Sequence, residues 1–171
     1  MPRAGQSAVV VPVPDAEPLV AAWRERHDPS AALGMPAHIT LLVPFLREER
    51  LSAEVVAGLG DLCGATPVLD VVFRRTARFP SVLYLAPEPV GELRWLTLAI
   101  AARWDTPPYG GAFDEVIPHL TVADGAADDV LDEADAAVSR ALPLAVRLAE
   151  AQLVVFDGDR WADRERLPFG R

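Results

Sequence analysis

Lysine is missing from this chain: all sixteen basic residues among its 171 are arginines, and 25 acidic residues give a formal net charge of −9. Broad electrostatic binding to nucleic acid needs a basic surface, so this balance argues against duplex DNA as a partner. Genomic composition is the simplest explanation for the missing lysine. Arg74, Arg75 and Arg78 leave open a smaller alternative, a local positive rim that would recognise phosphate.

Cysteine and long apolar runs are also scarce. The single cysteine, Cys63, excludes a disulfide framework and is expected to be a small buried hydrophobe in a helix. No apolar run approaches the roughly 20 residues that a bilayer requires. The run at 8–13 is too short for a signal peptide and has no small-residue cleavage site. We therefore expect a cytoplasmic protein with no membrane partner.

The remaining composition is that of a folded chain. Apolar residues make up 51% of it, which is incompatible with disorder. Its length suits a single domain over residues 1–171, or two small lobes that share a core. Nothing in the sequence calls for more than a monomer.

Apolar periodicity and turn residues predict alternating strands and helices. The expected strands are 9–13, 38–43, 68–74, 82–85, 119–123, 142–148, 152–156 and 161–166, and the expected helices are 15–26, 47–62, 91–103 and 128–141. A hairpin-like excursion at 76–80 and a turn at Asp157-Gly158 favour antiparallel pairing. The prediction is a pseudo-duplicated α+β fold, with two antiparallel sheets and outer helices around a central cleft.

Two matched tripeptides stand at the start of expected strands: His38-Ile39-Thr40 and His119-Leu120-Thr121. Residues i and i+2 of a strand project from the same face, about 6–7 Å apart, so each motif offers an imidazole and a hydroxyl side by side. The intervening apolar residues form the opposite face, which helices can cover. Two copies, holding two of the three histidines, indicate a site of paired His and paired Thr.

Such a pair suits acid–base chemistry at phosphorus. Histidine titrates near neutrality, so one imidazole can deprotonate an attacking water or hydroxyl while the other protonates the leaving oxygen. The threonine hydroxyls can donate hydrogen bonds to the non-bridging phosphoryl oxygens, where charge develops in the transition state. This division of labour needs neither a metal nor another cofactor.

Each of these residues also has a plainer interpretation. A single His-x-Thr is usually structural, but the repeated context argues against that here. His27 matches no motif and is expected to be a solvated loop residue. A metal site is disfavoured because His27 and His38 lack helical i, i+4 spacing and the carboxylates form no ligand run. Tyr109 and Phe113 could stack on a base or ribose, or could belong to the core.

The motifs and their surroundings resemble the 2H phosphoesterase superfamily, also called the LigT-like or 2′-5′ RNA ligase family. Its signature is two H-x-[TS]-x motifs about 80 residues apart, here His38-Ile39-Thr40-Leu41 and His119-Leu120-Thr121-Val122. The resemblance extends to the segments 36–45, 78–85 and 108–119 and covers essentially the whole chain.

The resemblance implies a bilobal, pseudo-twofold fold and metal-free cleavage of 2′,3′-cyclic phosphates, or of related cyclic phosphodiesters, to a monoester, as in RNA 2′,3′-cyclic phosphodiesterases. It implies that His38 is the acid that protonates the leaving oxygen and His119 the base that activates water. Thr40 and Thr121 correspond to the phosphate-binding hydroxyls, and Tyr109 is a weaker candidate for substrate binding.

Three function classes remain open. The favoured one is a cyclic phosphodiesterase that acts on a nucleotide or on an RNA-terminal cyclic phosphate. The second is a 2′-5′ RNA ligase or tRNA-processing enzyme, which should show a basic surface around the cleft; the acidic, lysine-free sequence departs from that pattern. The third is a nucleotide or RNA binder without catalysis, which would have no need for two intact histidines.

Overall fold

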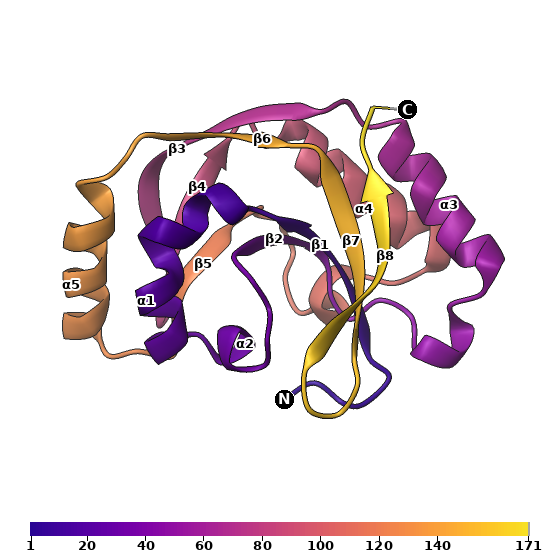
Figure 1. Ribbon diagram of the computed structural model, residues 1–171, viewed down its shortest axis with the longest axis horizontal. Helices are drawn as coiled ribbons and strands as arrows, with labels where there is room; N and C mark the ends of the chain where they lie inside the picture. The colour runs from indigo at the N-terminus through magenta and orange to yellow at the C-terminus, as the bar shows by residue number, and fades with distance from the viewer. Residues whose placement is uncertain (171) are drawn as a thin grey trace.

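A computed structural model describes residues 1–170. These residues form one antiparallel sheet of eight strands, in the order β6-β3-β4-β5-β2-β1-β7-β8, which curls through the middle of the molecule (Figure 1). The strands are β1 Ser7–Pro12, β2 His38–Leu42, β3 Leu69–Phe79, β4 Val82–Glu88, β5 Leu120–Asp124, β6 Leu144–Leu148, β7 Glu150–Phe156 and β8 Trp161–Pro168. The helices are α1 Glu17–His27, α2 Pro29–Ala32, α3 Ala53–Gly64, α4 Gly91–Trp104 and α5 Asp128–Ser139.

The predicted α+β class and two-lobed arrangement are confirmed, with one refinement. The two expected sheets are the two four-stranded halves of a single sheet, β6-β3-β4-β5 and β2-β1-β7-β8. These halves meet where β2 pairs with β5, through one pair of residues, Ile39 and Leu120. The two strands that carry the motifs are therefore neighbours at the centre of the molecule.

Helices are exchanged between the two halves. Helix α1 follows β1 but packs against β5 of the other half, where α5 also packs. Helix α4 follows β4 but packs against β2, and it contacts α3, which lies against β8. Figure 1 shows α1 and α5 on one side of the molecule and α3 and α4 on the other. Each half is thus covered partly by a helix that the opposite half supplies.

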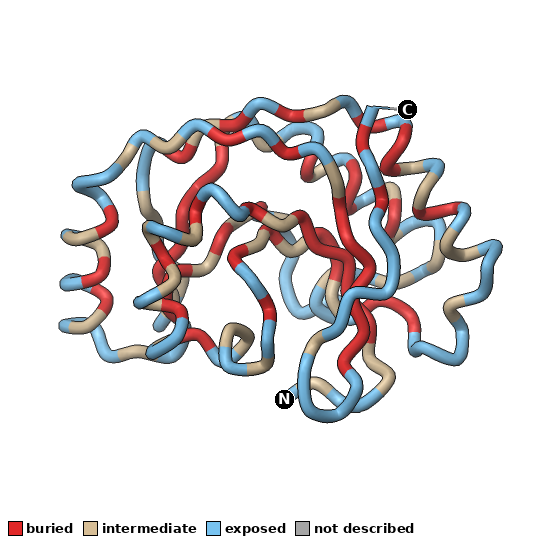
Figure 2. Tube along the Cα trace, viewed as in Figure 1, coloured by how far each residue is buried: buried red, intermediate tan, exposed pale blue. Residues whose placement is uncertain are grey.

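One large apolar core runs through both halves and includes the inward residues of both motif strands. Ile39, Leu41, Leu120 and Val122 are almost completely buried in it, as the alternation of the motifs predicts. Figure 2 shows buried residues concentrated along the central strands and exposed residues at the hairpin tips and outer helix faces. A smaller apolar cluster of Ala8, Val10, Met35 and Val154 lies apart from this core.

Several predicted boundaries are wrong, for local reasons. Helix α3 begins at Ala53 rather than near residue 47, because Ser52 accepts a hydrogen bond from the backbone N–H of Val55 and so caps the helix. Strand β3 continues through Phe79 instead of ending at residue 74. Its extra residues pair with β4, and the hairpin turn falls at 80–81.

The segment 27–37, which lies outside the strands and helices that the sequence predicts, contains the short helix α2. The Asp28 carboxylate accepts a hydrogen bond from the backbone N–H of Ser30, which caps this helix. Cys63 is buried, as expected. Within residues 1–170, no helix combines the length and the apolar character needed to cross a membrane.

Candidate active site

Strand register brings the two motifs together. Strand β2 begins at His38, and His119 immediately precedes β5. Because Ile39 lies opposite Leu120 in an antiparallel pair, His38 lies opposite Thr121 and Thr40 opposite His119. Opposed residues share one face of a sheet with Cβ atoms about 4.5–5.5 Å apart, and diagonal neighbours are roughly 7–8 Å apart. The two histidines are diagonal, which leaves room for a phosphate between them.

Both imidazoles are held in the same way. His38 Nδ1 lies 2.7 Å from the carbonyl oxygen of Pro36, and His119 Nδ1 lies 2.7 Å from that of Ile117. A carbonyl oxygen can only accept, so each Nδ1 carries the proton and donates it. In the neutral ring, Nε2 then has a free lone pair. The backbone two residues upstream therefore sets the tautomer of each histidine.

Burial keeps both rings neutral at neutral pH. It lowers the pKa of His38 from 6.5 to about 4, against the hydrogen bond to Pro36, which raises it; Arg24 lowers it further and Asp28 has a smaller raising effect. It also lowers the pKa of His119, against the hydrogen bond to Ile117 and the nearby Asp124 carboxylate. Burial and the negative charge of Asp28 raise the pKa of Asp124 itself. The free site thus presents two unprotonated Nε2 atoms.

Tyr109, the weaker candidate, is beside the first motif. Its phenol shares a hydrogen bond with the Thr40 side chain, while burial raises the pKa of Tyr109. Its backbone N–H donates to the carbonyl oxygen of Val43 at 2.7 Å, which ties the loop to the end of β2. Tyr109 adopts a positive φ of 52°, followed by Gly110 and Gly111 at 65° and 80°. This turn is what directs the phenol toward Thr40.

Two aromatic residues that the sequence did not single out surround His119. The rings of Phe79 and Tyr84 approach the imidazole edge-on, with centroids 5.2 and 5.4 Å away, and stack on each other at 4.4 Å. Tyr84 lies opposite Thr121 in the register of β4 and β5, so it shares that face. The strand pattern located Tyr84, but only the length of β3 and the pairing of β3 with β4 bring Phe79 to the site.

A buried ion pair supports the loop before His38. Arg24 Nε lies 2.9 Å from Asp28 Oδ2, with both side chains at most 4% exposed. Arg24 also donates to the Met35 carbonyl oxygen at 3.0 Å, and Asp28 accepts from Ser30. In sequence this i, i+4 pair is indistinguishable from a surface pair. It is buried because α1 crosses onto β5.

The arginines proposed as a positive rim are already paired. Arg74 and Arg75 lie 3.6 and 3.9 Å from Glu88, and Arg78 lies 2.8 Å from Asp132 and 3.3 Å from Asp135.

In residues 1–170, no cluster of three or more His, Cys, Asp or Glu side chains could hold a metal ion.

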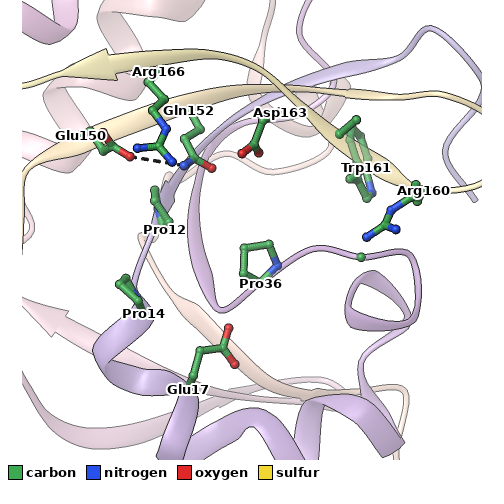
Figure 3. Close-up of a pocket in the computed structure, with 12 residues that line it drawn as sticks. Pro12, Pro14, Glu17, Pro36, Glu150, Gln152, Arg160, Trp161, Asp163 and Arg166 are labelled. Carbon is green, nitrogen blue, oxygen red and sulfur yellow. Dashed lines mark hydrogen bonds between the residues drawn. The ribbon is translucent and has the colours of Figure 1, made fainter.

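A cavity of about 710 Å³ adjoins the first motif (Figure 3). The motif side chains are not among its lining residues, but their neighbours are: Pro12 is the cross-strand partner of His38, and Pro36 holds its Nδ1. The opposite wall comes from β7 and β8 and includes Gln152, Trp161 and Arg166. The cavity therefore extends the site along the β1–β7–β8 half of the sheet.

Comparison with known proteins points to one family. Residues 11–160 match the family model of the 2'-5' RNA ligase superfamily. A Bacillus pumilus protein that is provisionally named a phosphoesterase is 31% identical over 125 residues, which cover 71% of this chain and 70% of that protein.

Solved structures of related fold cover nearly the whole chain. LigT of E. coli in its apo form superposes with a TM-score of 0.63 at 20% identity, over 99% of this chain and 100% of LigT. The TT0787 protein of Thermus thermophilus has a TM-score of 0.61 at 20% identity, covering 95% and 97% of the two chains. LigT has also been crystallised with 3'-AMP, ATP and NADP+.

Proposed function

Because the chain belongs to the 2'-5' RNA ligase superfamily, we propose that it is a metal-independent 2′,3′-cyclic phosphodiesterase that converts a nucleotide or RNA-terminal cyclic phosphate to a phosphomonoester. The observation that carries the proposal is the antiparallel pairing of Ile39 with Leu120, from which we infer that each motif histidine lies opposite the other motif's threonine on one sheet face. Two proton-transfer groups and two hydroxyl donors thereby surround one position for phosphorus.

In the proposed reaction, one neutral imidazole accepts a proton from water through Nε2 as the water oxygen bonds to phosphorus. The bond from phosphorus to one ribose oxygen breaks, and the other imidazole delivers a proton to that oxygen. Thr40 and Thr121 donate hydrogen bonds to the two non-bridging oxygens. Each proton transfer typically contributes about 10²–10⁴-fold in rate, and removing one donor to the developing charge costs about 10²–10³-fold.

The family resemblance assigns the acid role to His38 and the base role to His119, and we keep this assignment in the proposal. It has a consequence, because burial lowers the pKa of the free His38 to about 4. His38 can act as the acid only if it gains a proton in the substrate complex. The negative charge of a bound phosphodiester favours the protonated ring and so supplies this shift.

Nucleotide substrates are supported by the complexes of LigT with 3'-AMP, ATP and NADP+. The 2′-5′ ligase alternative would use the same groups in reverse. The pairing of Arg74, Arg75 and Arg78 with carboxylates weakens the local positive rim that the sequence suggested for phosphate recognition. We therefore favour hydrolysis of a small or terminal cyclic phosphate.

The proposal is tested by hydrolysis of nucleoside 2′,3′-cyclic phosphates in EDTA, with identification of the product regioisomer. Turnover to a 2′-phosphate by the wild type should be lost in His38→Ala and His119→Ala. His27→Ala is the matched control, because this third histidine ends α1 and lies outside both motifs; it should retain full activity. Unchanged rates in both motif variants, or dependence on added metal, would refute the mechanism.

A further inference from the structure

The cavity beside the first motif is aligned with Thr40 through the sheet. Val10 lies opposite both Thr40 and Gln152, and Gln152 lies opposite Arg166. Opposed residues share a face, so Gln152 and Arg166, which line the cavity, lie on the same sheet face as Thr40, and Val10 between them is buried in the smaller apolar cluster with Met35. Three strand spacings separate Thr40 from Arg166, about 14 Å at 4.8 Å per strand. An extended arginine side chain and one nucleotide unit can together cover that separation.

Arg166 and Arg160 line this cavity without ion-pair partners. Within residues 1–170, neither guanidinium lies within 4.0 Å of a carboxylate, although the chain has more acidic than basic residues. Gly34 makes room for Arg160: its φ is +85°, and a Cβ there would lie 3.2 Å from Arg160 Nη2. Two guanidiniums without a direct ion pair on a concave surface can contact an anionic ligand, although the Arg160 charge also acts on the Asp157 carboxylate.

Three carboxylates also line the cavity, and two of them already have donors. Glu17 accepts a hydrogen bond from the Ala37 backbone N–H at 2.5 Å, and Glu150 accepts one from Gln152 Nε2 at 3.3 Å. Asp163 remains, between Gln152 and Trp161 in Figure 3. Its carboxylate can accept a hydrogen bond from a ribose hydroxyl or a base amino group. The cavity wall therefore offers hydrogen-bond acceptors as well as donors to a nucleotide.

Trp161 supplies an aromatic surface in the same wall. Its ring is partly buried and contacts Phe156, with centroids 5.5 Å apart. Its backbone N–H donates to the Leu33 carbonyl oxygen at 2.8 Å, which anchors it to the segment that precedes His38. A fixed indole beside guanidinium groups is a common platform for a nucleobase.

We infer that this cavity binds the 5′ side of the substrate: Arg166 contacts a phosphate on the 5′ side of the cyclic phosphate, and Trp161 stacks on a base. The inference rests on the proposed function for the orientation of the ligand. Within that function, it narrows the preferred substrate to a cyclic phosphate whose nucleotide carries a second phosphate, either as a 5′-phosphate or as the phosphodiester of a chain.

The test compares kcat/KM for adenosine 2′,3′-cyclic phosphate, its 5′-phosphorylated form and a dinucleotide with a 2′,3′-cyclic end. We expect about a tenfold or greater preference for the two substrates with a second phosphate, the size of one charge-assisted hydrogen bond. Arg166→Gln should remove this preference, because it should lower kcat/KM for the two substrates with a second phosphate much more than for the 5′-hydroxyl substrate. The matched control is Arg164→Gln. Arg164 is on the same strand but lines a different surface, together with Leu51 and Val56, so this variant should keep the preference.

Equal kcat/KM for all three substrates in the wild type, or an undiminished preference in Arg166→Gln, would overturn the inference. A preference for the dinucleotide alone would also overturn the role of Arg166 as a binder of 5′-phosphate. Direct binding separates this inference from the proposed function. Adenosine 3′,5′-bisphosphate should bind more tightly than adenosine 3′-phosphate by calorimetry, and Arg166→Gln should abolish the difference, even if no substrate is hydrolysed.

Discussion

The two halves of the molecule present the same catalytic unit in different surroundings. His38 and His119 each donate through Nδ1 to a carbonyl oxygen two residues upstream, at the same distance of 2.7 Å. Around His38, however, the neighbours are polar: the Arg24–Asp28 ion pair and the cavity lined by β7 and β8. Around His119 they are mainly the rings of Phe79 and Tyr84, with the Asp124 carboxylate nearby.

The comparison separates the features that the two motifs share from those that differ between the two halves. Backbone geometry fixes the tautomer and direction of both imidazoles, so it is shared. The surroundings control proton affinity and access, and these differ: burial lowers the pKa of His38 as far as about 4. Identical groups with different environments can take different roles in one reaction. This difference can be tested by comparing substitutions near His38 with substitutions near His119.

The largest effect should be on kcat when either histidine is replaced, measured on two substrates whose leaving groups differ in their need for a proton. On a ribose 2′,3′-cyclic phosphate, both His38→Ala and His119→Ala should lower kcat by about 10³-fold, within the usual range for acid–base catalysis. On a 4-nitrophenyl phosphodiester, whose leaving group needs no proton, loss of the acid should cost far less. His38→Ala should then recover most of its activity, while His119→Ala should not. The reverse pattern would exchange the two roles.

The next effect is on stability and is confined to the His38 side. Arg24→Gln leaves Asp28 as a buried charge without its partner, and such changes typically cost about 3–5 kcal/mol. We expect a correspondingly lower midpoint in urea unfolding. Arg26→Gln on the same helix is the control, because Arg26 is exposed and makes a hydrogen bond to the Ala22 carbonyl oxygen and a cation–π contact with Trp23; it should change stability by about 1 kcal/mol or less. Equal effects of the two variants would contradict the buried role of Arg24.

The pH dependence of stability should also be larger on this side. The folded pKa of His38 is about 4, below its ordinary 6.5, so between these values the unfolded chain binds more protons. Stability therefore falls as pH decreases from 6.5 toward 4, by up to about 3 kcal/mol from this group. His119 contributes with the same sign, whereas the raised pKa of Asp124 opposes them at lower pH.

Urea unfolding of the wild type and His38→Gln at several values between about pH 4.5 and 7.5 measures this contribution. The variant should lose a large part of the slope, whereas His27→Gln should retain it. An identical slope in the wild type and His38→Gln would show that the ring is not buried in its neutral form.

The sequence located the motif strands well because their signal is local. Alternation in His38-Ile39-Thr40 and His119-Leu120-Thr121 placed the apolar residues in the core, where Ile39 and Leu120 are found. The pairing of β2 with β5 is different, because it joins residues about 80 positions apart. The predicted cleft depended on that contact, and only the folded chain specifies it at Ile39 and Leu120.

What the sequence missed depends on such distant contacts. Arg24 and Asp28 have the spacing of a surface pair, and their burial follows from α1 packing on the opposite half. Phe79 reaches His119 only because β3 extends five residues beyond its predicted end at residue 74. Arg166 lies in a strand rich in charged residues, and nothing in the sequence pattern distinguishes it from Arg164. Cross-strand register makes the distinction by placing Arg166 in line with Thr40.

The smallest effect should come from the aromatic residues, one from each side of the site. Tyr84→Leu removes one edge-on contact with His119, and such contacts contribute about 0.5–1.5 kcal/mol. Tyr109→Phe removes the phenol that shares a hydrogen bond with Thr40, a change of about 1 kcal/mol. Both should lower kcat/KM by roughly tenfold or less. Tyr84→Leu should in addition shift the NMR titration of the His119 ring, and shift that of His38 much less, because the His119 charge has only a small effect on the pKa of His38. Tyr109→Phe should leave both titrations unchanged. A larger shift of the His38 ring than of the His119 ring in Tyr84→Leu would contradict the assignment of Tyr84 to the surroundings of His119.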